Sequence, residues 1–212
     1  MKKLLIFIVL TSLSVPSMAQ AQESKSEFGI RGGVNLATLM SANEYDRNMK
    51  IGFHVGVFDK ISLSENFAIQ PELLYSLKGV KFNYDDEPLV DGYSKFNLHY
   101  IDLPVKFVFD ITDNFEIQVG PYLSYLVFAD VKTEGDVLNF FEINETDELD
   151  RKNFNTFDIG ASAGLGFNLS PLVIGINYNM GFIPVAKEDE DAYDMLEKGR
   201  NSVIEVYAGI KF

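Results

Sequence analysis

Residues 98–127 alternate between apolar and polar side chains with a period of two, and polar residues at 112–114 interrupt the alternation once. This pattern is typical of two β-strands joined by a tight turn, each strand having one apolar and one polar face. The polar faces carry charged residues, among them Asp102, Lys106 and Glu116. A transmembrane β-hairpin accounts for both faces, because lipid contacts the apolar one and a polar barrel interior contacts the other.

The same alternation occurs in eight segments of the chain. We expect strands within residues 28–36, 51–57, 67–76, 98–109, 115–127, 157–167, 172–182 and 204–212. Short turns at 64–66, 112–114 and 169–171 alternate with long connections at 40–48, 83–92, 134–153 and 184–201. Short turns at one rim and long loops at the other are typical of outer-membrane barrels with both chain ends on the periplasmic side. The sequence therefore predicts an all-β fold: an eight-stranded antiparallel up-and-down transmembrane β-barrel.

Aromatic residues on the apolar parity of these segments form two groups, one near each end of the strands. The group near the short turns comprises Phe28, Phe67, Phe109, Phe115, Phe167 and Phe212, and the group near the long loops comprises Tyr75, Tyr125, Phe157, Tyr178 and Phe182. Two aromatic girdles around an aliphatic band are expected at the two interfaces of a bilayer. A one-residue slip would turn any strand inside out, so the shared parity supports the predicted faces.

The first 21 residues have the composition of an export signal. Lys2 and Lys3 precede an apolar segment at 4–10, and small residues at 17–19 or 19–21 provide a cleavage site. We expect residues 1–21 to be removed after export and residues 22–212 to form the barrel domain in the outer membrane. Outside this segment, no apolar run approaches the roughly 18 residues that a membrane helix needs.

The charge and the cysteine content exclude several classes of function. Cleavage after Ala19 removes two of the 18 basic residues and none of the 31 acidic ones, so the net charge changes from −13 to −15. We expect no nucleic-acid partner, because nucleic-acid phosphates require basic surfaces. The chain has no cysteine, which excludes disulfides, thiolate chemistry and a lipidated N-terminal cysteine.

Several motifs resemble one known family, the PorT-like outer-membrane β-barrels of Bacteroidota, which are small porin-like proteins. The motifs are GIRGGVNLATL at 29–39, IGFHVGVF at 51–58, FAIQPELLYSLKG at 67–79, YIDLPVKF at 100–107, IQVGPYLSYL at 117–126, FDIGASAGLGF at 157–167 and VYAGIKF at 206–212. The resemblance implies the barrel fold and the outer membrane, and the type IX secretion component is one branch of the family. Phe212, with Ala208 and Ile210 on the same face, also resembles the C-terminal signal that the barrel-assembly machinery reads.

Neither the serine motif nor the histidines predict an enzyme. Ser162 lies in a Gly-x-Ser-x-Gly pattern at 160–164, but a nucleophile elbow needs a strand-to-helix turn, and here the strand alternation continues through it. His54 and His99 are too few for a metal site built on histidine, and we expect an interior histidine to join a polar network. We predict no catalytic centre, no metal and no cofactor.

Charged residues on the interior parity are the candidate site. They comprise Arg31, Glu72, Lys78, Asp102, Lys106, Glu116, Asp158, Glu205 and Lys211. Charge inside a membrane protein is costly unless it is paired, and an eight-stranded barrel is only wide enough to be filled by side chains. We therefore expect Arg31, Glu72, Asp102, Lys106 and Glu205 to form a buried ion-pair network that plugs and stabilises the barrel. A conducting pore is the alternative.

Acidic residues cluster in the predicted long loops. They include Asp85, Asp86, Glu87 and Asp91, then Glu142, Glu145, Asp147, Glu148 and Asp150, and finally Glu188, Asp189, Glu190 and Asp191. Carboxylates could bridge through Ca²⁺ or Mg²⁺ to lipopolysaccharide phosphates, although none has the spacing of a defined Ca²⁺ loop. We expect a structural or interaction role, with the bilayer, lipopolysaccharide and an unidentified envelope protein as partners. The alternatives are a narrow porin for small solutes and a secretion component like the PorT branch.

Overall fold

The computed structural model describes residues 25–40, 47–83, 90–137, 141–188, 196 and 198–212. The predicted signal peptide at 1–21 lies outside these residues. The strands are β1 (Ser26–Met40), β2 (Arg47–Asn48), β3 (Lys50–Ser64), β4 (Phe67–Asn83), β5 (Val90–Thr112), β6 (Phe115–Val137), β7 (Phe141–Leu149), β8 (Phe157–Leu169), β9 (Leu172–Pro184) and β10 (Arg200–Lys211). A single 3-10 turn, η1 (Arg151–Asn153), follows β7. Within the described residues, no helix has the length and apolar content of a membrane span.

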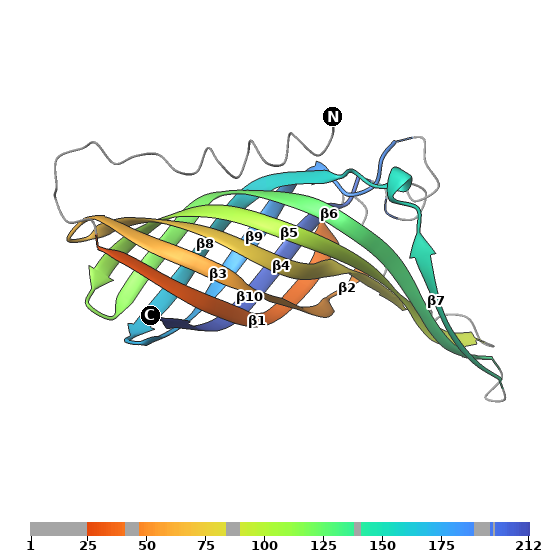
Figure 1. The fold of residues 1–212 in the computed structure, drawn as a ribbon. Helices are drawn as coiled ribbons and strands as arrows, with labels where there is room; N and C mark the ends of the chain where they lie inside the picture. Colours follow the sequence, from red (N-terminus) through yellow and green to blue (C-terminus); the bar gives the residue numbers. More distant parts are fainter. Residues whose placement is uncertain (1–24, 41–46, 84–89, 138–140, 189–195, 197) are drawn as a thin grey trace.

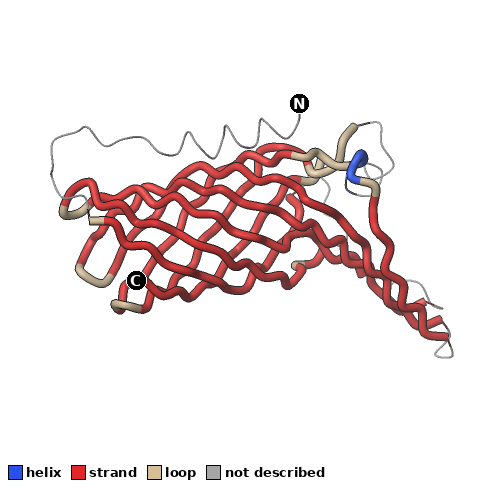
Figure 2. The backbone as a smooth tube through the Cα atoms, in the orientation of Figure 1, coloured by secondary structure: helices blue, strands red, loops and turns tan. Residues whose placement is uncertain are grey.

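Eight of these strands form a closed antiparallel ring, which confirms the predicted fold. Each strand pairs with the next in the order β1, β3, β4, β5, β6, β8, β9 and β10. The ring closes where the first strand pairs with the last, from Gly29 opposite Lys211 to Met40 opposite Arg200. Figures 1 and 2 show the tilted strands wrapping into a cylinder, with the C-terminus beside the short turns.

The two faces of the ring differ as the alternation predicted. Apolar side chains point outward and are accessible, for example Ile51 at 73% and Leu165 at 42% exposure. Polar side chains on the other parity point inward and are covered, for example Lys106 at 1% exposure. A soluble protein does not leave such an apolar band in contact with water, so the band is the surface that lipid covers.

The predicted long loop at 134–153 is wrong at 134–137 and 141–149, which are strand, and the predicted loop at 83–92 is wrong at 83 and 90–92, whereas residues 84–89 and 138–140 lie outside the described residues. Strands β5 and β6 stay paired to Val90 opposite Val137, and β7 adds a further strand that pairs with β6. The alternation did not reveal these extensions because the inward parity changes chemistry along β5. It carries charge at Asp102 and Lys106 but becomes apolar at Phe96 and Leu98, so the lipid-facing pattern no longer stands out.

These extensions continue the sheet of the barrel beyond the point where the ring ends. Strand β3 last pairs with β4 at His54 opposite Ser76, and β8 last pairs with β6 at Phe157 opposite Tyr125. Beyond those points β4, β5 and β6 continue together, flanked by β2 and β7. We call residues 77–83, 90–99 and 128–137, with β2 and β7, the projecting sheet. Figure 1 shows it reaching away from the cylinder at the end opposite the short turns.

A hydrophobic cluster fills the interior at the same end of the barrel. Its buried members are Leu39, Val80, Phe96, Leu98, Tyr100, Leu126, Ala129, Phe154, Val185, Ala186 and Leu196. The connection after β9 contributes three of them, and Ala186 forms a β-bridge with Phe154. Val185, Ala186 and Leu196, which lie in the predicted long connection at 184–201, are therefore buried against residues of the strands. We call the whole cluster the apolar cap.

Candidate functional site

Four of the predicted interior charges meet in the middle of the barrel. Arg31 of β1 donates to Glu72 of β4 through Nη1 at 2.9 Å and to Glu205 of β10 through Nη2 at 3.1 Å. Lys106 of β5 places Nζ 3.0 Å from the same Oε1 of Glu72. All four side chains are at most 3% exposed. We call these four residues the central network.

Neutral polar side chains add hydrogen bonds around the central network, although Nε of Arg31 and Oε2 of Glu72 have no hydrogen-bond partner among the described residues. Gln70 donates to Glu72 at 2.7 Å, and Lys106 donates to Gln118 at 3.3 Å. With its amide oxygen turned toward the cations, Asn177 accepts from Lys106 at 2.9 Å and from Arg31 at 3.0 Å. The Arg31 guanidinium also lies 3.9 Å above the centroid of the Tyr207 ring. Buried charges need such additional partners, because pairing alone does not repay their desolvation.

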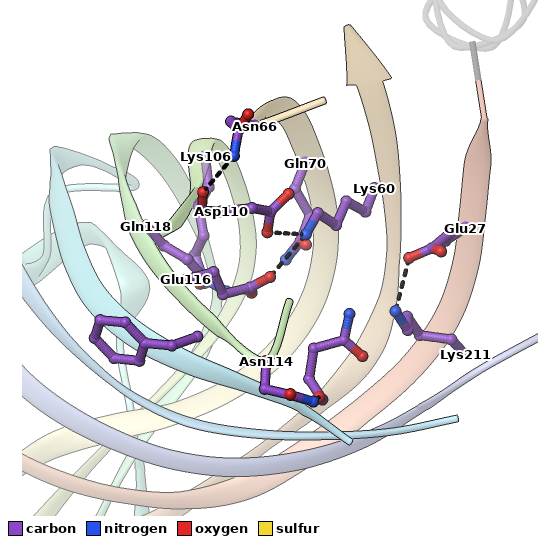
Figure 3. Close-up of polar contacts among 12 residues, drawn as sticks. Glu27, Lys60, Asn66, Gln70, Lys106, Asp110, Asn114, Glu116, Gln118 and Lys211 are labelled. Atoms are coloured by element: carbon purple, nitrogen blue, oxygen red, sulfur yellow. Dashed lines mark hydrogen bonds and ion pairs between the residues drawn. The ribbon is translucent and has the colours of Figure 1, made fainter. Parts of the chain in front are cut away.

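A second group of ion pairs lies toward the short turns, as Figure 3 shows. Lys60 of β3 donates to Asp110 and to Glu116, each at 2.7 Å. Glu116 in turn accepts from Gln118 at 2.6 Å, which connects this group to the central network. Close to the rim, Lys211 of β10 pairs with Glu27 of β1 at 2.7 Å. Ion pairs therefore continue from the central network to the short-turn end of the lumen.

Asp102 has a different partner from the other four predicted network residues. It pairs with Lys78 of β4 at 2.9 Å, and Lys78 also donates to Ser124 at 3.1 Å. Near this pair Asp158 accepts from Tyr122 at 3.1 Å and from Asn201 at 2.9 Å. This third group lies between the central network and the apolar cap.

Two small cavities lie in the lumen on either side of the central network. A cavity of about 10 Å³ lies on the short-turn side of the central network, lined in part by Lys60, Gln70 and Tyr207. Another of about 10 Å³ lies on the other side, lined in part by Lys78 and Tyr122. A water molecule needs roughly 10–15 Å³ of such volume. Each cavity is therefore limited to about one water molecule.

The histidines and Ser162 occupy separate places. His54 lies inside the barrel, with Nδ1 2.6 Å from Oδ1 of Asn35. His99 lies on the outer face, between the hydroxyl of Tyr75 and Oδ1 of Asp130. Ser162 is buried within β8, directly opposite Gly120 and Asn179, and no helix follows it. These positions do not assemble the serine, histidine and acid that a hydrolase needs.

The predicted girdle aromatics lie at the two ends of the outer band. Near the short turns, the rings of Phe67 and Phe109 have centroids 5.2 Å apart, as do those of Phe115 and Phe167. Near the other end, Tyr125 and Phe157 are 5.5 Å apart. The remaining members, Phe28, Tyr75, Tyr178, Phe182 and Phe212, are on the same outward parity. Their role at bilayer interfaces stays a prediction.

The acidic residues of the predicted loops lie mostly outside the described residues, or have side chains that the structure does not describe. Two exceptions are Asp150, which caps η1 and pairs with Lys152 at 3.4 Å, and Glu188, which pairs with Lys198 at 3.7 Å. Within the part of the chain that the structure describes, no group of three or more histidine or acidic residues is arranged to hold a metal ion.

Three charged residues of the interior groups, Glu27, Lys60 and Asp110, escaped the sequence reasoning, and Glu27 lies just before the predicted first strand at 28–36. Lys60 and Asp110 were not assigned to the interior, because the predicted second strand stopped at Val57 and the predicted fourth at Phe109. Strand β3 continues to Ser64 and β5 to Thr112. Continuing the alternation past the last clearly apolar residue would have placed Lys60 on the parity of His54.

Comparison with known proteins gives one family and several similar structures. A family model described as an outer membrane protein beta-barrel domain matches residues 18–187, and no curated protein matches the sequence. The chain is similar to Ail, the attachment invasion locus protein of Yersinia pestis, with 16% identity, a TM-score of 0.44, and 89% of this chain and 99% of Ail covered. It is also similar to Neisserial surface protein A, with 15% identity, a TM-score of 0.46 and coverage of 89% and 99%. A third similar structure is the outer membrane protein OprG of Pseudomonas aeruginosa, with 11% identity, a TM-score of 0.43, and 89% of this chain and 97% of OprG covered.

Proposed function

The chain belongs to the outer membrane protein β-barrel domain family, and we propose that it is a structural barrel that engages a partner at its extracellular end, without catalysis and without conducting solutes. The signal peptide at 1–21 directs export, and the barrel-assembly machinery inserts the chain through its C-terminal strand. Both chain ends then face the periplasm, and the projecting sheet and the acidic loops face outward. This orientation is supported by the position of the short turns, which lie at the same rim as the start of β1 and the end of β10.

The filled lumen is the observation that carries the non-conducting role. The central network joins β1, β4, β5 and β10 across the interior through Arg31, Glu72, Lys106 and Glu205. Cavities of about 10 Å³ flank it, and the apolar cap occupies the extracellular end. A hydrated ion needs continuous space several times larger than one water site. The ion pairs therefore act as a structural plug.

The projecting sheet is the observation that supports a role in interaction. A barrel with no role outside the bilayer would need no paired strands beyond its rim. Strands β5 and β6 nevertheless remain paired as far as Val90 opposite Val137. Strand β7 of this sheet includes four acidic residues, Glu142, Glu145, Asp147 and Glu148. We propose that an envelope protein and lipopolysaccharide are the partners on this side.

Planar-bilayer recording tests the proposal. Purified mature protein, refolded in lipid, should give no discrete conductance steps over a voltage range in which a known porin gives them in the same membrane. Large, long-lived steps would contradict the plug and favour the narrow porin. Copurification in mild detergent should recover a defined envelope partner, and a deletion strain with a cargo secretion defect would favour the secretion component instead.

A further inference from the structure

A groove crosses the outer face of β6, β8 and β9 within the apolar band and reaches β10 at Ile204. Its volume is about 480 Å³. Its two walls are rows of outward side chains, and within each row the residues are directly paired from strand to strand, so they share one face of the sheet. One row comprises Val119, Ala163 and Tyr178, and the other comprises Ile117, Leu165 and Ile176. We call this feature the outer groove.

The short side chain of Ala163 widens the groove at its centre. Ala163 is directly opposite Val119 on one side and Tyr178 on the other, and both of these side chains are longer. The floor is the strand backbone between the two rows, for example at Gly164. The polar side chains of the floor residues point into the lumen, so the surface that the groove offers to an occupant is apolar.

The two ends of the groove differ in chemistry. Toward the short turns, the next outward residues on β6 and β8 are Phe115 and Phe167, whose ring centroids lie 5.2 Å apart. At the other end, the hydroxyl oxygens of Tyr178 and Ser202 lie 3.0 Å apart. The groove therefore runs obliquely through the band, from an aromatic pair near the short turns to two hydroxyl groups at the predicted extracellular interface.

A linear hydrocarbon fits this groove better than a second protein does. Between apolar surfaces in a bilayer, association gains from close packing and not from leaving water. A second barrel has a convex wall, which would bridge the groove and leave it unfilled, whereas an acyl chain can contact both walls and the floor. An engineered cavity of about 150 Å³ holds one benzene ring, so 480 Å³ has room for roughly 18 carbon atoms, or one acyl chain.

We propose that the outer groove holds one acyl chain of a lipopolysaccharide molecule of the outer leaflet. The hydroxyl groups of Tyr178 and Ser202 lie at the end from which such a chain descends, where they can hydrogen-bond its ester or amide group. A phospholipid chain from the inner leaflet would enter at the opposite end, which the rings of Phe115 and Phe167 flank. The inference rests on the proposed orientation in the outer membrane, and it assigns recognition to the acyl chain and not to the phosphates.

Lipopolysaccharide retention tests the inference. Wild type, Ala163→Phe and the control Ala208→Phe are refolded in phosphatidylethanolamine nanodiscs with lipopolysaccharide, and the bound lipid is counted by native mass spectrometry after release into mild detergent. Ala208 is also an exposed, outward alanine, but it lies on β10 opposite Gly32 and Ile174, outside the groove. We expect wild type and control to retain roughly tenfold more lipopolysaccharide than Ala163→Phe, whose ring fills the groove, a difference of about 1.4 kcal/mol. With O-deacylated lipopolysaccharide, which keeps its phosphates, the difference should vanish.

Equal retention of intact lipopolysaccharide by all three proteins would overturn the inference, while leaving lipopolysaccharide as a partner through another surface. Preferential retention of phosphatidylethanolamine by wild type would overturn it as well, and so would a wild-type dimer that Ala163→Phe converts to a monomer, because a second copy would then cover the groove. If Ala163→Phe does not fold, as judged by denaturant titration, Ala163→Leu gives the same readout. Conductance reports on the lumen and retention on the outer wall, so each proposal can fail without the other.

Discussion

At the scale of single residues, Arg31 connects parts of the chain that are far apart in sequence. Its guanidinium joins Glu72 and Glu205, which are 41 and 174 positions away in sequence. Burying such charges costs several kcal/mol per ion, and only well-placed partners repay it. Removing the charge of one member of the central network should therefore lower the stability of the barrel strongly, whereas replacing several members together by uncharged residues should lower it less.

Replacing Arg31 alone should destabilise the barrel. Arg31→Met leaves Glu205 buried without a cation and Glu72 with only Lys106, so we expect the free energy of unfolding to fall by about 3–5 kcal/mol. Urea titration in lipid vesicles measures the loss. The combined variant Arg31→Met/Glu72→Gln/Glu205→Gln leaves fewer unpaired charges and should recover most of it. A single variant as stable as wild type would contradict the structural role of the network.

Sequence parity identified which charges face the interior but not which of them meet. Arg31, Glu72, Lys106 and Glu205 come together, whereas Asp102 pairs with Lys78 in a separate group. Contacts across a barrel depend on how far each strand is shifted against its neighbours. Alternation within a strand contains no information on that shift, so partners could not be assigned from sequence.

At the scale of elements, the projecting sheet depends on a backbone feature of β4. Gly79 has a φ of 131°, a conformation that side-chain-bearing residues rarely adopt, and a Cβ there would lie 1.9 Å from the carbonyl oxygen of Phe96. Only glycine allows β4 to stay paired with β5 through this point. The backbone of the projecting sheet therefore requires glycine at position 79.

Gly79→Ala should loosen the projecting sheet and leave the ring intact. The substitution combines backbone strain with a steric overlap, so we expect at least about 1–3 kcal/mol of local destabilisation. Hydrogen exchange should accelerate in β4 and β5 beyond Gly79, while amides between β1 and β10 keep their protection. Matched exchange in both regions would show that the projecting sheet does not depend on this conformation.

Element lengths were the least predictable part of the fold. The eight ring strands follow from alternation against lipid, because one face must remain apolar throughout the bilayer. Beyond the bilayer that requirement ends, and β5 and β6 continue to Val90 and Val137 without a lipid-facing pattern to mark them. The projecting sheet arises from the register of these extended strands, so it could not be found before that register was known.

At the scale of the whole molecule, the apolar band determines how the barrel lies in the membrane. Val119 of β6 lies between the girdle residues Phe115 and Tyr125, opposite Phe107 and Ala163, whereas Leu172 begins β9 beside a short turn. Both side chains point outward, with 43% and 49% exposure. They differ mainly in their expected depth in the bilayer.

Arginine substitutions at these two positions should have unequal effects. We expect Val119→Arg to lower the free energy of unfolding by about 2–4 kcal/mol, as at the bilayer midplane, and Leu172→Arg by about 0–1 kcal/mol, as near an interface. Guanidinium titration in phospholipid vesicles compares them directly. Equal losses at both sites would mean that the band does not lie across the bilayer in this way.

Ring closure between β1 and β10 also couples the pairing of buried charges to the docking of the last strand. Arg31 belongs to the first strand, and its partner Glu205 belongs to the last. Until the final segment of the polypeptide docks, that cation is only half neutralised and the wall has an open seam. Closure of the wall and the pairing of Arg31 with Glu205 are thus completed in the same event, when β10 docks.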